Sequence, residues 1–324
     1  MSTSNENLVK KADIALADLS SGGGLLTPEQ NQQFVRVLME SPTLFNSIRM
    51  VTMNSPTRKI NKIGFGSRIL NAAGSAITDI NGNGNRALSA AQRSKPELSQ
   101  VVLNTKEVIA ELHIPYEVFE DNIEGGNINV SMGRSPGGLQ DTIVTMIAER
   151  AALDFEELCI DGDTTSGDSY LALHDGFLKM ATDHIVDANG KTVSKDIFKA
   201  GVNAMPPKYL RNRTALKHFI SVDNENEYRD TLANRQTALG DASVQGNNSV
   251  YSFGSEVVGV PLMPGDKGIF TNPLNLIFGI QRQITIEYDK DIRSRMFIIV
   301  LTARMAMAIE ETNAVVAYKN LLGT

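Results

Sequence analysis

Cysteine is nearly absent from this chain. Cys159 is the only one among 324 residues, which excludes an intrachain disulfide framework. A chain without disulfides fits a reducing compartment such as the cytosol. Cys159 also stands in an apolar pattern with helical spacing, so we interpret it as a small buried hydrophobic residue rather than a nucleophile.

The chain also lacks an excess of basic residues. Its 31 lysines and arginines are outnumbered by 37 acidic residues, which gives a net charge of −6. Non-specific binding to nucleic acid requires a basic surface, so the composition argues against that class of function.

Long hydrophobic runs are missing as well. No apolar stretch reaches the roughly 18 residues that a membrane-spanning helix needs. The first residues do not follow the charged and then apolar order of a signal peptide. We therefore expect a protein made in the cytoplasm, with no membrane partner.

Motifs that would support catalysis are weak. The string 161–165 (DGDTT) matches the D-x-D-x-T string of phosphoaspartate hydrolases, in which two carboxylates act near Mg²⁺. That chemistry places the string after a buried strand, whereas a helical pattern precedes it here, so we interpret it as a helix end. Among the histidines, which show no metal-ligand spacing, we expect His113 on a strand face and His174, His184 and His218 at the surface or in turns. We expect no catalytic residue, no metal and no cofactor.

Two strand-like segments, 51–65 and 101–114, flank a stretch rich in glycine and asparagine, 66–100. Within the second segment, a period of two over 108–114 predicts a half-buried strand. One face would carry Val108, Ala110, Leu112 and Ile114, and the other Ile109, Glu111 and His113. The middle stretch has few large apolar side chains, so it cannot offset the entropy cost of ordering its backbone. Such an extended hairpin is best explained if another chain supplies its partner, which favours an assembly protein over an enzyme.

The strongest helical pattern begins after Gly138 and ends at 161–163. Apolar residues recur at four-residue spacing from Leu139 to Phe155, which is typical of an amphipathic helix. At about 1.5 Å per residue, this helix spans on the order of 30 Å. The acidic residues of the segment, among them Glu156, are expected largely off the apolar stripe.

Shorter helices and strands follow this helix. A helix is expected over 193–205 and a polar helix or turn over 224–232. Strands are expected over 217–222, 276–279, 284–288, 296–302 and 305–310, with a last apolar segment at 314–321. Because helices and strands do not alternate as regular βαβ units, we predict an α+β fold.

This order of parts resembles the major capsid protein of tailed bacteriophages, the shell fold of the Hong Kong 97 type. Glu111–Asp121 resembles that family's exit from its extended loop, and Ala152–Asp163 resembles the end of its spine helix. Val258–Leu262 is similar to a strand of its axial domain, and Ile284–Leu321 to its closing strands. The resemblance covers nearly the whole chain past about residue 27 and rests on the arrangement of these parts.

The resemblance implies four parts: an N-terminal arm (1–50), an extended loop (51–114), a peripheral domain (115–163 plus 280–324) and an axial domain (164–279). It implies self-assembly into hexamers and pentamers of an icosahedral shell that encloses double-stranded DNA without binding it specifically. Implied partners are further copies of the chain, a separate scaffolding protein, a portal and a decoration protein. The implied location is the virion capsid, after assembly in the host cytoplasm.

Contacts between copies would then involve the extended loop. Basic residues on its first arm usually form a solvated face, but on an arm that docks elsewhere they could pair with acids of a neighbouring copy. The candidate residues are Arg58, Lys59, Lys62 and Arg68 on the loop and Glu149, Glu156 and Glu157 on the long helix.

Two alternatives stay open at this point. One is an encapsulin, a cellular cage of the same fold that holds an enzyme as cargo. The other is a Mg²⁺-dependent phosphohydrolase that uses Asp161 and Asp163.

Overall fold

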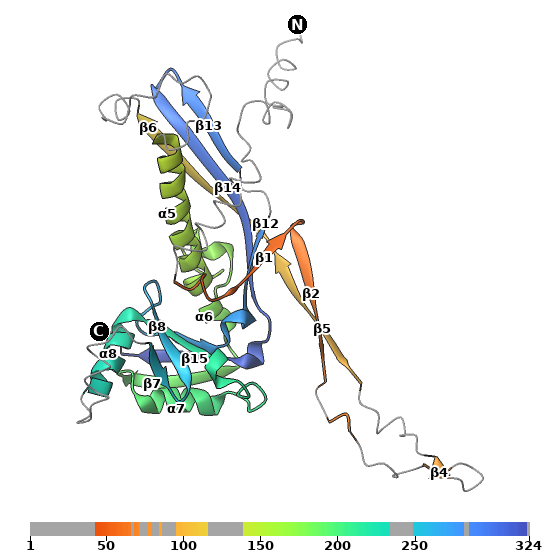
Figure 1. Cartoon of the computed structure of the whole chain (residues 1–324). Coiled ribbons are helices and arrows are strands. Elements are labelled where there is room, and N and C mark those ends of the chain that lie inside the picture. The colour runs from red at the N-terminus through yellow and green to blue at the C-terminus, as the bar shows by residue number, and fades with distance from the viewer. Residues whose placement is uncertain are drawn as a thin grey trace. The chain divides into compact units, whose positions relative to one another are not determined.

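The computed structural model of the chain describes residues 43–65, 68–70, 77–78, 84–85, 95–115, 139–233, 249–281 and 285–322. It divides into two compact units, one of Met1–Pro56 with Asn104–Thr324 and one of Thr57–Leu103. Figure 1 labels the main elements of both units. Most of the expected N-terminal arm and most of the loop tip lie outside the described residues.

The larger unit contains a five-stranded sheet. It consists of β1 (Arg49–Met53), β12 (Leu276–Gln281), β14 (Met296–Ile309), β13 (Thr285–Asp291) and β6 (Lys106–Pro115). β1 runs parallel to β12, whereas β12, β13 and β6 each pair antiparallel with β14. β14 is 14 residues long and joins the sheet together.

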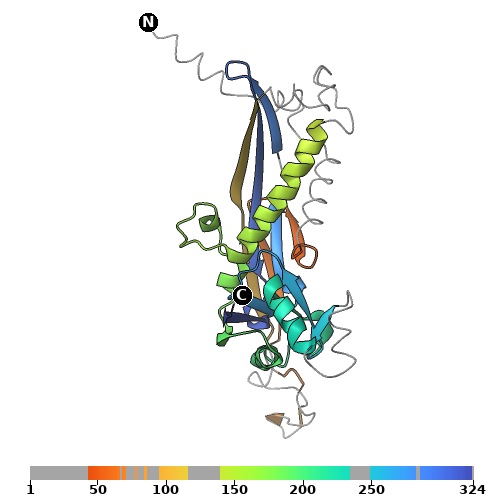
Figure 2. The ribbon, with the colours of Figure 1, turned by 90° about the vertical axis from the view of Figure 1, so that its left-hand side faces the viewer.

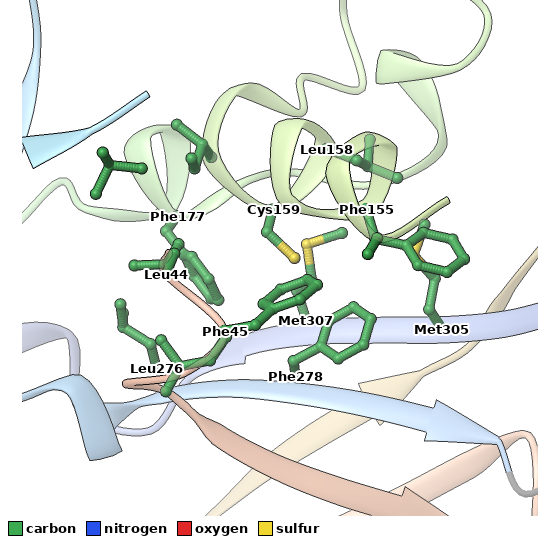
Figure 3. Packing of buried hydrophobic residues seen from close by; sticks show 14 of the residues in the cluster. Leu44, Phe45, Phe155, Leu158, Cys159, Phe177, Leu276, Phe278, Met305 and Met307 are labelled. Carbon is green, nitrogen blue, oxygen red and sulfur yellow. The ribbon is translucent and has the colours of Figure 1, made fainter. Parts of the chain in front are cut away.

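The long helix α5 (Leu139–Asp161) lies alongside the long strands β6 and β14, as Figures 1 and 2 both show. Its apolar stripe and the inner face of the sheet form one core, part of which Figure 3 shows: Phe155, Leu158 and Cys159 from the helix, and Phe278, Met305 and Met307 from the strands. Cys159 is buried, as predicted. The predicted bounds of this helix are confirmed.

A six-stranded sheet forms the rest of the larger unit. Its strands are β7 (His184–Lys191), β15 (Val315–Leu321), β11 (Gly268–Thr271), β8 (Lys217–Ser221), β10 (Ser255–Val260) and β9 (Val250–Ser252), in that order across the sheet. The helices α7 (Lys195–Ala204) and α8 (Val222–Ala233) bury Phe198 and Tyr228 in its core. The short helices are η2 (Leu171–Leu173), α6 (Phe177–Met180), η3 (Arg213–Ala215), η4 (Pro273–Asn275) and η5 (Thr312–Ala314).

His218 lies at the centre of this second core, fully buried on β8. Its Nδ1 is 2.9 Å from the hydroxyl of Tyr318, and its ring stacks on Phe270 at 4.1 Å. Burial lowers the pKa of His218 to about 3, so the ring is neutral at physiological pH. The expectation of a surface or turn position was wrong for this histidine, because Phe219 and Ile220 mark a buried strand around it.

The smaller unit is a two-stranded ribbon of β2 (Thr57–Gly64) and β5 (Glu97–Asn104). Farther along, the short strands β3 (Ile77–Thr78) and β4 (Gly84–Asn85) pair antiparallel. Nearly all side chains of β2 are exposed or half-buried, so the ribbon has little core of its own.

The two expected arms are each divided between the ribbon and the five-stranded sheet. Val51–Met53 belongs to β1 and pairs with β12, and Lys106–Pro115 pairs with β14. The expectation of one continuous hairpin was therefore wrong at both ends, since only Thr57–Leu103 separates as its own unit. The predicted alternation within 108–114 is confirmed for most positions: Val108 is buried and Ile109 is 68% exposed, but Leu112, expected on the face of Val108, is 38% exposed.

Two expectations about the C-terminal strands also need correction. The segments 296–302 and 305–310 are one strand, β14, because Ala303 and Arg304 continue the inward and outward alternation. The last strand, β15, pairs with β7 and β11 in the six-stranded sheet, although 280–324 was expected to form one domain with 115–163. β12 differs in the opposite direction. Most of it was expected in the domain 164–279, but it pairs with β1 and β14 in the five-stranded sheet.

Candidate functional site

The smaller unit, Thr57–Leu103, carries all four predicted basic candidates. Arg58, Lys59 and Arg68 are exposed, and Lys62 is half-buried. Because side chains alternate along a strand, Arg58 and Lys62 share one face of β2, while Lys59 lies on the other face with Ile63. The basic group is therefore split over both faces of the ribbon.

Large apolar side chains are exposed beside these charges. Ile63 is 72% exposed and Leu98 is 74% exposed, and Phe65 and Leu70 are also more than half exposed. Several such residues on one small unit are unusual for a monomeric protein and typical of a surface that binds another protein.

Charge is also unevenly divided along the chain. Seven basic and two acidic residues lie in Thr57–Leu103, so this segment carries a net charge of +5. Because the whole chain carries −6, the rest of the molecule carries −11. The smaller unit and the rest of the chain therefore carry opposite charge, a complementarity of the kind that steers association between proteins.

Two of the three acidic candidates lie on the surface of α5. Glu149 and Glu157 are exposed, together with Met146 and Leu153. These four residues recur at spacings of three and four, so they form one stripe along the helix. The stripe combines negative charge with exposed apolar surface.

Glu156 was wrongly expected off the apolar stripe, because the structure places it inside the subunit. Only 1% of the residue is exposed, and its Oε1 accepts a hydrogen bond from the backbone N–H of Leu44 at 2.5 Å. Burial raises its pKa, although bonds from the backbone of Leu44 and Thr43 oppose that shift. Its spacing from Ala152 and Cys159, four and three residues away, is the signal that could have revealed this.

The aspartates of the hydrolase-like string make structural contacts. Asp163 Oδ1 accepts hydrogen bonds from Lys179 Nζ at 2.5 Å and from the backbone N–H of Thr165 at 2.7 Å. The hydrogen bond from Lys179 is the main reason that the pKa of Asp163 is lowered. Asp161 lies 3.3 Å from Lys267 Nζ. These aspartates therefore stabilise the turn that ends α5, as the helix-end interpretation predicts.

Metal-binding groups are not found in the described part of the chain. No three His, Cys, Asp or Glu side chains within it are arranged to hold a metal ion. His113 lies on β6 as expected, with its Nε2 2.6 Å from Glu111 Oε1. In the same described ranges, none of the helices has the length and apolar character required to cross a membrane.

Comparison with known proteins identifies relatives over nearly the full length. No family model matches the chain. The "Putative prophage capsid protein YqbE" of Bacillus subtilis (strain 168) is 46% identical over 323 residues, which cover 96% of this chain and 97% of that protein.

Solved structures with similar folds are also capsid proteins or phage proteins. A chain of the satellite phage P4 procapsid with size determination (Sid) protein gives a TM-score of 0.62 at 17% identity, covering 98% of both chains. A chain of the native GTA particle capsid gives a TM-score of 0.61 at 14% identity, covering 88% of this chain and 90% of that one. A chain from Mycobacterium phage Cain gives 0.57 at 13% identity, covering 95% and 98%. At these identities the similarity shows the fold.

Proposed function

Since this chain belongs to the major capsid proteins of tailed bacteriophages, which have the Hong Kong 97 type of fold, we propose that it assembles into hexamers and pentamers of an icosahedral shell around double-stranded DNA. It is located in the capsid of the virion. Its role is structural rather than catalytic. In this proposal the five-stranded sheet with α5 is the peripheral domain, and the six-stranded sheet is the axial domain around the capsomer axis.

The observation that carries the proposal is the composition of Thr57–Leu103. Its strands β2 and β5 form a ribbon with exposed Ile63 and Leu98, and the segment carries a net charge of +5 on a chain whose remainder carries −11. A two-stranded ribbon is at best marginally stable by itself in water. Contact with another copy would cover the apolar side chains and place the basic ones near opposite charge.

The acidic stripe of α5 is the surface proposed to receive the ribbon. Glu149 and Glu157 supply negative charge, and Met146 supplies exposed apolar area between helical turns. Glu156 is not part of this surface, because its carboxylate binds the backbone of its own subunit. Rim charges of this kind mainly influence the rate and specificity of association.

The remaining partners follow from the same proposal. A scaffolding protein, a portal and a decoration protein would act during or after shell assembly. The DNA is enclosed without specific binding, which suits a chain whose net charge is −6.

Deletion of residues 71–93 tests the proposal, since it removes the loop tip and leaves β2 and β5 intact. We expect the variant to fold, with its thermal unfolding near that of the full chain, but to form no closed shells by negative-stain electron microscopy. A matched control replaces 71–93 with a glycine-serine segment of equal length. If the deletion variant forms normal closed shells, the loop tip 71–93 has no part in assembly.

A further inference from the structure

The six-stranded sheet ends in two different edges. β7 is the first strand in its order and β9 is the last. Five strand spacings separate them, so the two edges are about 24 Å apart at roughly 4.8 Å per spacing. A subunit with two unlike edges on opposite sides can contact its neighbours head to tail, and such contacts form rings.

The β9 edge carries a strained hairpin turn. Ser252 pairs with Ser255, so Phe253 and Gly254 form a two-residue turn, with φ angles of 49° and 88°. A turn with positive φ at both positions favours asparagine and glycine, and a bulky side chain there is uncommon. Strain of this kind is typical of functional positions.

This turn also places aromatic side chains in solvent. Phe253 is 45% exposed, and Tyr251 on β9 is 59% exposed. Arg213 of η3 lies beside the turn, since its carbonyl accepts a hydrogen bond from Ser255 Oγ at 3.1 Å, and its side chain is exposed. Aromatic residues and arginine are the side chains most enriched in the energetic centres of protein interfaces.

The β7 edge offers the complementary chemistry. Ile185 is 49% exposed, and the exposed residues Asp183 and Asp187 lie two positions before and after it. Hydrogen bonds from Asn189 and Asn320 hold the pKa of Asp187 below its ordinary value, so it is negatively charged at neutral pH. The basic residue of this strand, Lys191, is at its other end.

We propose that the turn at Phe253 and Gly254 docks on the β7 edge of a second copy of this chain, with Ile185 as the apolar contact and Asp183 facing Arg213. The contact is head to tail, so repeated copies close into a ring. The proposal rests on the proposed function and deepens it, because it names the surfaces that join axial domains within a capsomer.

A pair of introduced cysteines tests this contact in the full chain. Within one copy, positions 185 and 253 are too far apart for a disulfide, which needs Cα atoms within about 7 Å. The native Cys159 is buried, so it gives little background. We expect oxidised particles of the variant with Ile185→Cys and Phe253→Cys to give a ladder of covalent oligomers on a non-reducing denaturing gel. Each single variant serves as the control and is expected to stay monomeric on that gel.

A second variant separates assembly from folding. Phe253→Asn suits the turn better than the native residue, so the unfolding temperature is expected to stay equal or rise. Loss of the aromatic contact should raise the protein concentration needed for assembly by about tenfold or more. Leu274→Asn changes an apolar residue on η4 that is 60% exposed, against 45% for Phe253, so it is the matched control and should assemble as the native chain does.

The outcomes distinguish this inference from the proposed function. If the native chain forms shells but the double cysteine variant gives no ladder, the edge contact is overturned and the shell function stands. A covalent dimer from either single variant would indicate a symmetric contact and would also overturn the inference. If the native chain forms no shells, the proposed function fails, and the inference falls with it.

Discussion

The carboxylate of Glu156 binds the backbone N–H of Leu44 across 112 residues of sequence. This hydrogen bond joins the buried face of α5 to the turn that precedes β1. Leu44 and Phe45 in that turn are buried, and the ring of Phe45 lies 4.8 Å from that of Phe278. Glu156 therefore fixes the point where the N-terminal part of the chain reaches the first core.

Removing this carboxylate should destabilise the fold. Glu156→Ala leaves a buried N–H of Leu44 without its partner, which costs roughly 1–3 kcal/mol of unfolding free energy. Urea unfolding of the two proteins measures the difference. Glu157→Ala is the matched control, because Glu157 is exposed, and it should stay within about 0.5 kcal/mol of the native chain. An equal loss of unfolding free energy in the two variants would contradict a stabilising role for the hydrogen bond between Glu156 and Leu44.

The same carboxylate predicts a pH effect. Burial raises the pKa of Glu156 above its ordinary value of 4.5, so the folded state holds this proton more tightly than the unfolded state. Its contribution to stability is present below about pH 4.5 and is lost as pH rises through the raised pKa. The native chain should therefore lose stability relative to Glu156→Gln over that window. A difference in unfolding free energy between the two proteins that stays constant across these pH values would refute the prediction.

His218 predicts the opposite slope at a different pH. Its folded pKa is about 3 against an ordinary 6.5, so the unfolded state takes up a proton that the folded state refuses. The contribution of the neutral ring to the unfolding free energy is fully present above pH 6.5. It falls as pH drops from 6.5 towards 3, by at most about 1.4 kcal/mol per pH unit. In His218→Gln this component should disappear. Parallel pH profiles for the two proteins would contradict the buried, neutral ring.

Gly201 leaves room for Tyr318, the partner of His218. A Cβ at this position of α7 would collide with the hydroxyl and ring of that tyrosine. Gly201→Ala should therefore cost about 1–3 kcal/mol of unfolding free energy, as overpacked cores do. Gly167→Ala is the control, since nothing lies within 4 Å of its added Cβ. Calorimetry measures the unfolding temperatures of both variants, and equal values would contradict the predicted collision with Tyr318.

The basic ribbon predicts a salt effect on assembly. Screening shortens the range of charge interactions from about 10 Å at 0.1 M salt to about 3 Å at 1 M. Light scattering should show slower assembly of the native chain at high salt. A variant with Arg58→Glu, Lys59→Glu and Lys62→Glu should assemble more slowly at low salt and depend less on salt. If reversing these three charges leaves the assembly rate unchanged, these residues take no part in the contact between copies.

Local patterns in the sequence predicted some elements well. The four-residue spacing that ends at Phe155 predicted α5, and the alternation after Val108 predicted the two faces of β6. In both cases the signal lies within one element, and burial on one side produces it.

Pairing between distant segments could not be predicted in the same way. Arg49–Met53 joins β12 across more than two hundred residues, and β15 crosses to the other sheet, with no local pattern to indicate either partner. Glu156 was misplaced because a charged residue is assumed to face solvent. Its buried position depends on backbone N–H groups that only the fold brings near it.

Electron microscopy of the purified full-length chain tests the central claim most directly, with reconstruction of any particles that form. We expect closed icosahedral shells in which the Thr57–Leu103 ribbon of each copy lies on a neighbouring copy, and we expect particles from phage-producing cells to contain double-stranded DNA. A chain that stays monomeric at high concentration, or shells that hold an enzyme in place of DNA, would contradict the account.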